Sequence, residues 1–353
     1  MAGATAKDIA KKLGISTASV SVALNGKPGV SAATRQRILA AAAELGYYAP
    51  KITAADSRQF CFLIYIDPEV GIVKASTYYT FVLQSVERAA KELGCRVLIR
   101  YYYANRSFTE QMSDILQDID GLLVLGTDMT GAQQSELGGM IVNGSLPFPV
   151  VVIDNFILSA YADCVGNDNL YGTKAAVSYL IDQGRRTFAY VRANQRVANF
   201  EDRENGIRLA IAEHLGGEAA PLMVIPVDIS PDRTFHDICS WLEQSPTLPE
   251  AIIAENDEVA AAAIRALRSR DCAVPEAVAV MGFDDIPICE MVDPAITTVH
   301  THKEQLGSEA VSLLYRRIVA GETAQSIRSH GCIKLALSTR IVVRGSTGPL
   351  DRC

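Results

Sequence analysis

The sequence predicts an α/β protein in which a small all-α head precedes a larger body of doubly wound parallel sheets. Residues 1–48 contain no apolar run of strand length, only short helical segments and Gly or Pro turns. After Pro50, short Val/Ile/Leu-rich runs alternate with amphipathic helical segments. This alternation is typical of parallel sheets that helices cover on both faces. At 353 residues, the chain is long enough to form more than one domain.

Three helices are expected in the head. A first helix is expected over residues 5–12, and a second runs to Leu24 with Ser16 or Thr17 as its cap. Asn-Gly and Pro-Gly pairs follow as a turn, and Ser31 caps a third helix. The apolar residues expected to pack the helices together are Ile9, Leu13, Val20, Leu24, Ile38, Leu39, Ala42 and Leu45. Three such helices with a tight turn between the first two predict a helix-turn-helix head.

The body is expected to contain two lobes. Eight apolar runs are predicted as strands: 60–66, 96–103, 121–126, 149–154, 187–191, 222–227, 251–256 and 277–285. Amphipathic helices such as 79–94 and 257–270 lie between them. Because this stretch is too long for one sheet, two doubly wound lobes are the favoured arrangement, with a ligand crevice at the strand ends.

The charge of the chain is unevenly distributed. The formal net charge is −7, but residues 1–58 carry eight Lys or Arg against three acidic residues, a net charge of +5. The remainder therefore carries −12. A basic head on an acidic body indicates an anionic partner for the head alone.

Composition and motifs exclude several classes. No apolar run approaches the length of a membrane span, and no signal-peptide core precedes Lys7, so a cytoplasmic protein without membrane contact is expected. The eight cysteines form no C-x-x-C pair or zinc-type cluster, which favours reduced thiols. His300 and His302 could face one side of a strand as metal ligands, but a structural use is favoured and no metal site is predicted. The common hydrolase, dinucleotide, P-loop and zinc-protease motifs are absent, so neither an enzyme nor a cofactor is expected.

An ordered series of stretches carries a family resemblance. The head TAKDIAKKLGISTASVSVALNGKPGVSAATRQRILAAAAELGY is followed by GTKAAVSYLIDQGRRTFAYV, the R-x-x-G of Arg203 to Gly206, AENDEVA, VPEAVAVMGFDDI and ITTVHTHKEQLGSEAV. Up to about Arg344, the sequence resembles the lactose/galactose repressor (LacI/GalR) family of bacterial transcription regulators.

This resemblance implies a function and its partners. It implies a regulator, expected to be a repressor, whose paired heads bind a palindromic operator in nucleoid DNA as a homodimer or a tetramer. It also implies a body like the periplasmic binding proteins, which closes on a small effector such as a sugar, a nucleoside or a related metabolite. The alternative left open is a cytosolic ligand-binding protein that does not regulate DNA.

The resemblance also implies which residues contact DNA. Base contacts are expected from Thr17, Ala18 and Val22. Phosphate contacts are expected from Thr5, Ser16, Ser19, Ser21, Asn25, Ser31, Thr34 and Tyr47. Arg commonly stands at the position of Val22 in the family. Because Val and Ala cannot hydrogen-bond a guanine edge, readout is expected to depend on thymine methyl groups.

The linker departs from the family pattern. Family members commonly carry a hinge helix whose Leu wedges into the minor groove and kinks the operator. Asp56 falls on that Leu position, where a carboxylate would face the negative potential of the groove. Ile52 is the nearest apolar substitute. Little kinking is therefore expected, and a merely solvated linker over 49–59 is an equal alternative.

The expected effector contacts lie near strand ends or helix starts in the body. They are Asp154, Arg203, Asn256 and Asp284, with Tyr78 and Tyr79 as an aromatic wall. Converging acidic, Arg and Asn side chains suit the hydroxyl groups of a sugar or nucleoside. Alternatives remain open for all of these except Asp154: Arg203 as a solvated charge, Asn256 as a helix cap, Asp284 as a strand end and the tyrosines as core residues.

The predicted domain boundaries follow from these assignments. They are a head at 1–48, a linker at 49–59, a body at 60–344 and a frayed tail at 345–353. Within the body, the N-lobe is predicted at about 60–165 plus 296–325. The C-lobe is predicted at about 166–295 plus 326–344.

Overall fold

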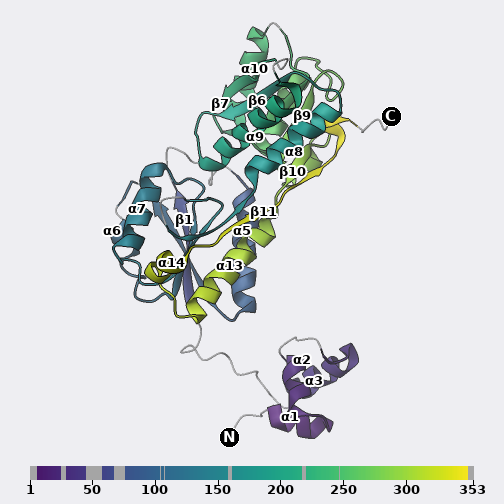
Figure 1. Ribbon diagram of the computed structural model, residues 1–353. Helices are drawn as coiled ribbons and strands as arrows, with labels where there is room; N and C mark the ends of the chain where they lie inside the picture. The colour runs from purple at the N-terminus through teal and green to yellow at the C-terminus, as the bar shows by residue number, and fades with distance from the viewer. Residues whose placement is uncertain are drawn as a thin grey trace. The chain divides into compact units, whose positions relative to one another are not determined.

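A computed structural model of the protein describes residues 6–24, 29–44, 58–66, 76–103, 105–106, 108–157, 161–216, 220–245 and 247–348. The chain divides into two compact units, Met1–Ser57 and Arg58–Cys353 (Figure 1). The predicted hinge residues Ile52 and Asp56 lie outside the described residues.

The first unit is a bundle of three helices. They are α1 (Ala6–Leu13), α2 (Thr17–Leu24) and α3 (Ala32–Glu44). Ile9, Val20 and Ile38, one from each helix, are fully buried against one another. Burying three large aliphatic side chains is the main stabilising contribution that so small a bundle has available. The predicted helix-turn-helix fold of the head is confirmed, although the side chains of the predicted core residues Leu24, Leu39 and Leu45 lie outside the described ones.

Serine side chains begin two of these helices. Ser16 Oγ accepts a hydrogen bond from the Ser19 amide (3.0 Å), so Ser16 rather than Thr17 caps α2. Ser31 Oγ accepts from the Thr34 amide (3.1 Å) and caps α3, as predicted. Each cap satisfies an amide that the first helical turn leaves without a partner.

The second unit contains two six-stranded sheets. The first has the order β11-β5-β4-β3-β1-β2 and is parallel throughout. Its strands are β1 (Gln59–Ile66), β2 (Arg96–Tyr103), β3 (Gly121–Leu125), β4 (Val150–Ile153), β5 (Asp163–Asn167) and β11 (Lys334–Leu337). Helices α5 (Tyr78–Glu92) and α13 (Lys303–Val319) cover one face. Helices α6 (Phe108–Met112), α7 (Gly131–Val142) and α14 (Ala324–His330) cover the other.

The second sheet has the order β12-β10-β9-β8-β6-β7 and is parallel except for β12. Its strands are β6 (Phe188–Ala193), β7 (Met223–Val227), β8 (Ala251–Ala254), β9 (Ala279–Asp284), β10 (Thr297–His300) and β12 (Arg340–Val342). Helices α8 (Asn169–Asp182) and α9 (Ala198–Leu215) cover one face. Helices α10 (Pro231–Gln244) and α11 (Asp257–Arg268) cover the other, with the short α12 (Ile288–Met291) beside them.

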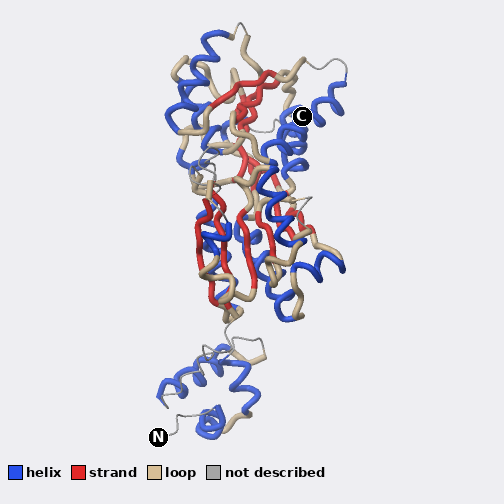
Figure 2. The backbone as a smooth tube through the Cα atoms, turned by 90° about the vertical axis from the view of Figure 1, so that its left-hand side faces the viewer, coloured by secondary structure: helices blue, strands red, loops and turns tan. Residues whose placement is uncertain are grey.

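The chain passes between these two lobes three times. It crosses from β5 to α8, returns from β10 to α13, and crosses again from β11 to β12. Figure 2 shows the strands of the two sheets as two separate groups joined by these connections. The predicted doubly wound, two-lobed body is confirmed, and the carboxyl ends of the strands face the region between the lobes.

Three details of the predicted domain boundaries are corrected. Residues 297–300 form β10 in the second lobe, not the first, because they pair with β9. Residues 334–337 form β11 in the first lobe, because they pair with β5. Residues 345–347 are a packed 3-10 turn rather than a frayed tail, because Ser346 Oγ donates to the carbonyl of Val280 (2.6 Å). The remaining boundaries stay predictions.

Candidate nucleic-acid interface and ligand cleft

The amino end of α2 presents a small, polar surface. Thr17 and Ala18 are exposed, and Val22 is half-buried on the same helix. Val20 is fully buried and anchors the opposite side of the helix. Small side chains at an exposed helix start allow the backbone to approach a phosphate or a base edge closely.

Hydroxyl groups surround this surface. Ser16, Ser21 and Ser31 are exposed, while Ser19 and Thr34 are half-buried. Ser16 Oγ lies 2.9 Å from Ser19 Oγ, and Ser31 Oγ lies 2.8 Å from Thr34 Oγ1. The predicted phosphate contacts Thr5, Asn25 and Tyr47 lie outside the described residues.

A basic side chain ties the second and third helices together. Arg35 Nη1 donates to the carbonyl of Ala23 (3.1 Å), near the end of α2. Lys11, Lys12 and Arg37 are exposed. Among the described side chains of the head, exposed positive charge is therefore carried by α1 and α3.

In the second unit, the structure brings all six predicted effector contacts into one pocket. The pocket is lined by Ser76, Tyr78, Tyr79, Thr127, Asp154, Asn199, Phe200, Arg203, Asn256 and Asp284. These residues come from both lobes. The remaining cavity is about 10 Å³, room for roughly one water molecule. The polar groups of the pocket are bonded to one another, so a ligand has to replace some of these internal contacts.

Arg203 is the central cation of this pocket. It is only 5% exposed, which rules out the alternative of a solvated charge. Its three nitrogens donate to Asn169 Oδ1 (3.0 Å), the Glu255 carbonyl (2.6 Å) and Asp284 Oδ1 (3.1 Å). The guanidinium also lies 3.8 Å from the centre of the Phe283 ring. Burial alone would lower the pKa of Arg203, but the neighbouring carboxylates, Asp284 foremost, raise it, so Arg203 stays charged.

Asp154 is the acidic side chain contributed by the first lobe. Its carboxylate accepts from Thr127 Oγ1 (2.8 Å) and from Nδ2 of Asn199 (3.1 Å). Asn199 belongs to the second lobe, so this bond joins the two lobes across the pocket. Burial raises the pKa of Asp154 to about 6, although the Thr127 hydrogen bond and the charge of Arg203 act in the opposite direction.

Two carboxylates of the site sit on strained backbone. Asp154 follows β4 with φ +61°, and Asp284 ends β9 with φ +109°. Side chains other than Gly rarely adopt these values, which cost on the order of 1–3 kcal/mol each. The buried Lys303 donates to the carbonyl of Asp284 and to that of Asp285 (3.1 Å). This lysine thereby holds the bend that directs Asp284 toward Arg203.

Asn256, Tyr78 and Tyr79 both support the fold and line the pocket. Asn256 Oδ1 accepts from the Val259 amide (2.9 Å), so Asn256 caps α11 while it lines the pocket. The Tyr78 hydroxyl accepts from Asn167 Nδ2 (2.8 Å). Tyr78 is buried, Tyr79 is half-buried, and their rings meet edge to face at 5.0 Å. Packing and pocket lining are therefore compatible roles for these residues.

Close packing of two helices explains the glycine of the R-x-x-G stretch, Gly206. A Cβ atom at Gly206 would lie 2.1 Å from Thr173 Oγ1 and 2.4 Å from the carbonyl of Leu170. Only glycine allows α9 to approach α8 so closely. One helical turn earlier, the same helix directs Arg203 into the pocket.

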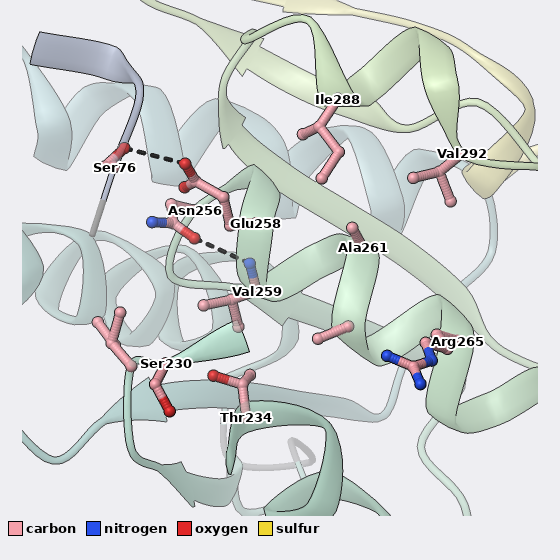
Figure 3. Close-up of a pocket in the computed structure, with 12 residues that line it drawn as sticks. Ser76, Ser230, Thr234, Asn256, Glu258, Val259, Ala261, Arg265, Ile288 and Val292 are labelled. Carbon is pink, nitrogen blue, oxygen red and sulfur yellow. Dashed lines mark hydrogen bonds between the residues drawn. The ribbon is translucent and has the colours of Figure 1, made fainter. Parts of the chain in front are cut away.

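A second, larger cavity adjoins the pocket (Figure 3). Its volume is about 400 Å³, within the usual range for small-ligand sites. Ser76 and Asn256 line both cavities. The walls of the larger one come mainly from α11 and are largely apolar, with Val259, Ile288 and Val292 among them.

Several residues of the pocket were not predicted. Thr127 lies two residues after the end of β3, and Asp154 directly follows β4, so its position after a strand would have identified Thr127. Asn199 lines the pocket from α9, and Asn169 of α8 supports it by bonding to Arg203. The spacing of these asparagines carries no comparable signal. Among the described residues, no cluster of three or more His, Cys, Asp or Glu could hold a metal. His300 Nδ1 instead lies 2.7 Å from Asp285 Oδ2.

The buried carboxyl groups around the pocket should make the stability of the protein depend on pH. Burial raises the pKa of Asp154 to about 6 and those of Glu255 and Asp257 to about 7. A pKa raised by folding means that the native state binds the proton more tightly. The contribution of these groups to the free energy of unfolding is present in full below about pH 4 and is lost as the pH rises toward 7. We expect the free energy of unfolding, from urea titrations, to fall between pH 5 and 7.

A matched variant isolates one of these groups. Glu255→Gln preserves the shape of the side chain that accepts from the Ala193 amide (2.7 Å) but does not titrate. Its free energy of unfolding should therefore depend less on pH over the same interval. An unchanged dependence would show that Glu255 is already ionised at pH 5. Asp285, whose pKa is lowered by His300 and Arg344 despite partial burial, should contribute only at more acidic pH.

Comparisons with known proteins match this geometry. Residues 5–50 match "Bacterial regulatory proteins, lacI family", and residues 177–347 match "Periplasmic binding protein-like domain". The chain belongs to the lacI family of bacterial regulatory proteins. The match to the lacI family covers the three helices of the head, and the second match covers most of the second lobe together with α13, α14 and β11.

Individual relatives of this lacI-family chain span nearly its whole length. The HTH-type transcriptional repressor PurR of Pasteurella multocida (strain Pm70) is 28% identical over 320 residues, 89% of this chain and 92% of that protein. The ribose operon repressor of Escherichia coli (strain K12) is 28% identical over 351 residues, 97% of this chain and 99% of that protein. The solved transcriptional regulator CelR-cellobiose complex is 26% identical with a TM-score of 0.67 and covers 97% and 99% of the two chains.

These findings establish the general function. The lacI-family chain is a DNA-binding transcription repressor that is controlled by a small ligand. Its named relatives are transcriptional repressors. Within the described part of the chain, no helix is long and apolar enough to cross a membrane.

Proposed function

We propose that the protein reads its operator with Thr17, Ala18 and Val22. Its operator affinity falls or rises when a metabolite of the sugar or nucleoside class occupies the pocket of the body. The observation that carries this proposal is the convergence of Asp154, from the first lobe, with Arg203 and Asp284, from the second. Polar side chains from two lobes that meet around one pocket let a ligand stabilise the closed arrangement. The protein has no catalytic role in this proposal.

A homodimer is the proposed working unit. Strand β2 is an edge strand of the first sheet, and Ile99, Tyr101 and Tyr103 project from one face of it with 44%, 55% and 39% exposure. A row of exposed large apolar side chains on an edge strand suits a protein interface. Two heads related by a two-fold axis would match a palindromic operator, at the chromosome in the cytoplasm.

The proposal is tested with the full-length protein. Its operator is first selected from random duplexes, and sugars and nucleosides are screened for a rise in melting temperature, because a ligand of the native state stabilises it. Operator affinity is then measured by fluorescence anisotropy with and without each stabilising compound. A change in affinity supports the proposal. A ligand that stabilises the body, with no DNA sequence selected, would favour the alternative of a ligand-binding protein without a regulatory role.

The division between base and phosphate contacts gives a separate prediction. Thr17→Ala should change the preferred operator sequence, since each altered base contact is worth about 1–3 kcal/mol. Ser19→Ala should weaken binding to all sequences alike, by about 0.5–1.5 kcal/mol for one neutral hydrogen bond. Random-duplex selection on both variants measures this. An identical consensus from wild type and Thr17→Ala would contradict the assignment of Thr17.

A further inference from the structure

The cation of the pocket is already neutralised by the protein. Each nitrogen of Arg203 donates to a protein oxygen, and Asp284 lies at ion-pair distance (3.1 Å). Asp284 belongs to the same lobe as Arg203, so this ion pair does not depend on the other lobe. Arg203 therefore offers little uncompensated positive charge to an anionic ligand.

Asp154 differs because its partners are uncharged. It accepts from Thr127 and Asn199, and Asn167 Nδ2 lies 3.4 Å from its other oxygen. No described Lys or Arg forms an ion pair with it. The hydroxyl of Thr127 and the Nδ2 of Asn199 are both spent on this carboxylate. The carboxylate of Asp154 is thus buried without an ion-pair partner among the described residues. The donor groups around it are already bonded to it.

Glu258 adds a second acceptor in the larger cavity, next to Ser76, which lines both cavities. Glu258 Oε1 accepts from Ser76 Oγ (3.1 Å), a contact between the lobes that Figure 3 shows as a dashed line. Its Oε2 is buried, and no described residue donates to it. A buried carboxylate oxygen without a donor is costly, and a ligand that supplies a donor removes this cost. Burial raises the pKa of Glu258, and the charge of Asp284 acts in the same direction.

Arg265 does not neutralise the charge of the Glu258 carboxylate. It lines the larger cavity but lies seven residues after Glu258 on α11, about 10 Å along the helix. Its guanidinium lies 4.2 Å from the centre of the Phe235 ring. Between Glu258 and Arg265 the wall is apolar and suits the C–H face of a sugar or a heterocycle.

We infer that the effector presents hydroxyl or amine donors to Asp154 and Glu258 and carries no phosphate or carboxylate group, with Glu258 as a specificity-determining residue. This inference rests on the proposed function, because it concerns the effector of the same site. An anionic group next to Asp154 and Glu258 would meet two carboxylates with which no described Lys or Arg forms an ion pair. Like charges held close together in a partly desolvated site disfavour such a ligand.

The test uses matched compounds on the full-length protein. Glucose is compared with glucosamine, gluconate and glucose 6-phosphate, ribose with ribose 5-phosphate, and adenosine and cytidine with their 5′-monophosphates. Binding is followed by melting temperature and calorimetry, and operator affinity by anisotropy. We expect the neutral or amine member of a series to bind at least tenfold more tightly than its anionic counterpart.

Two variants assign the discrimination to Glu258. Glu258→Gln retains an oxygen for Ser76 but presents an amide where Oε2 stood. It should bind the neutral or amine compound roughly ten- to 150-fold more weakly, as expected for the loss of one charge-assisted hydrogen bond, and should discriminate less against the anionic one. Glu276→Gln, at an exposed position of the same lobe, should match wild type in both respects.

The outcomes separate the inference from the function. Tight binding of an anionic member to wild type would overturn the inference, and the regulatory function would still stand if that compound altered operator affinity. Binding of a neutral compound with no effect on operator DNA would contradict the function and leave the inference in place. Unchanged affinity and discrimination in Glu258→Gln would remove Glu258 from the site.

Discussion

Raising the salt concentration from 50 to 200 mM should weaken operator binding about 10³-fold or more. Residues 1–58 of each chain carry a net charge of +5, and Lys11, Lys12 and Arg37 are exposed on α1 and α3. Two such heads could neutralise roughly 6–10 phosphates, and each phosphate contact releases condensed counterions. Anisotropy titrations of the full-length protein at several salt concentrations give the slope of log affinity against log salt.

Variants of the head and the body locate the source of this slope. Arg37→Gln should reduce the slope by about one if Arg37 contacts a phosphate. Arg233→Gln is the control, because Arg233 lies in the body and pairs with Asp228 (2.7 Å). A less than tenfold loss of affinity over the whole range would contradict the expected phosphate contacts of the head.

Arg203→Ala should lower the free energy of unfolding by about 3–5 kcal/mol. The reason is that Asp284 would stay buried without its ion pair, and a buried charge without a partner costs this much. Urea unfolding of the full-length protein measures the change. Arg208→Ala is the matched control on the same helix, because its pair with Glu204 is half-exposed and should be worth only about 0.3–0.5 kcal/mol.

A double-mutant cycle checks the physical cause. Asp284→Ala alone should also destabilise the protein, and the combination with Arg203→Ala should cost clearly less than the two single losses together. Additive losses would show that Arg203 stabilises the fold through its other contacts. Below its unfolding temperature, the Arg203→Ala protein should bind operator like wild type without effector and require roughly ten- to 150-fold more effector.

Hydrophobic patterning made most of the fold predictable. β1 and β4 are continuous apolar runs, and the structure buries them on both faces. β5 was not predicted, because DCVGN contains too few large apolar residues to resemble a buried strand. Its Asp163 is fully buried, and Arg317 forms two bonds to it (2.8 and 3.0 Å). The partner lies 154 residues later in the chain, and no local pattern contains that information.

The same reason explains the corrected ends of the second lobe. β10 and the turn at 345–347 are rich in Thr and Ser, which are typical of loops. In the fold, Thr297 Oγ1 donates to the carbonyl of Arg344 (3.0 Å), and Thr298 Oγ1 donates to Asp257 (2.5 Å). These hydroxyls become suitable for a buried position only once distant acceptors are assembled around them.

The candidate site was predictable where it follows strands. Asp154 and Asp284 end apolar runs, and the carboxyl ends of parallel strands are where ligands bind in such sheets. Arg203 required the family resemblance, because its own surroundings, FEDREN, resemble a solvated helix face. Glu258 gave no signal of its own, since only the contact with Ser76, 182 residues away, places it beside a residue that lines both cavities.

The three passages of the chain between the lobes decide how the protein can be recombined. Neither lobe is a continuous piece of sequence, so one crossover between two relatives cannot transfer a whole lobe with its share of the pocket. Residues 1–57, by contrast, form a unit that is continuous in sequence. A single junction near Ser57 would exchange operator recognition and leave all six predicted effector contacts in their native body. DNA recognition can therefore be exchanged as one module, whereas effector recognition can be transferred only with the whole body and not with a single lobe.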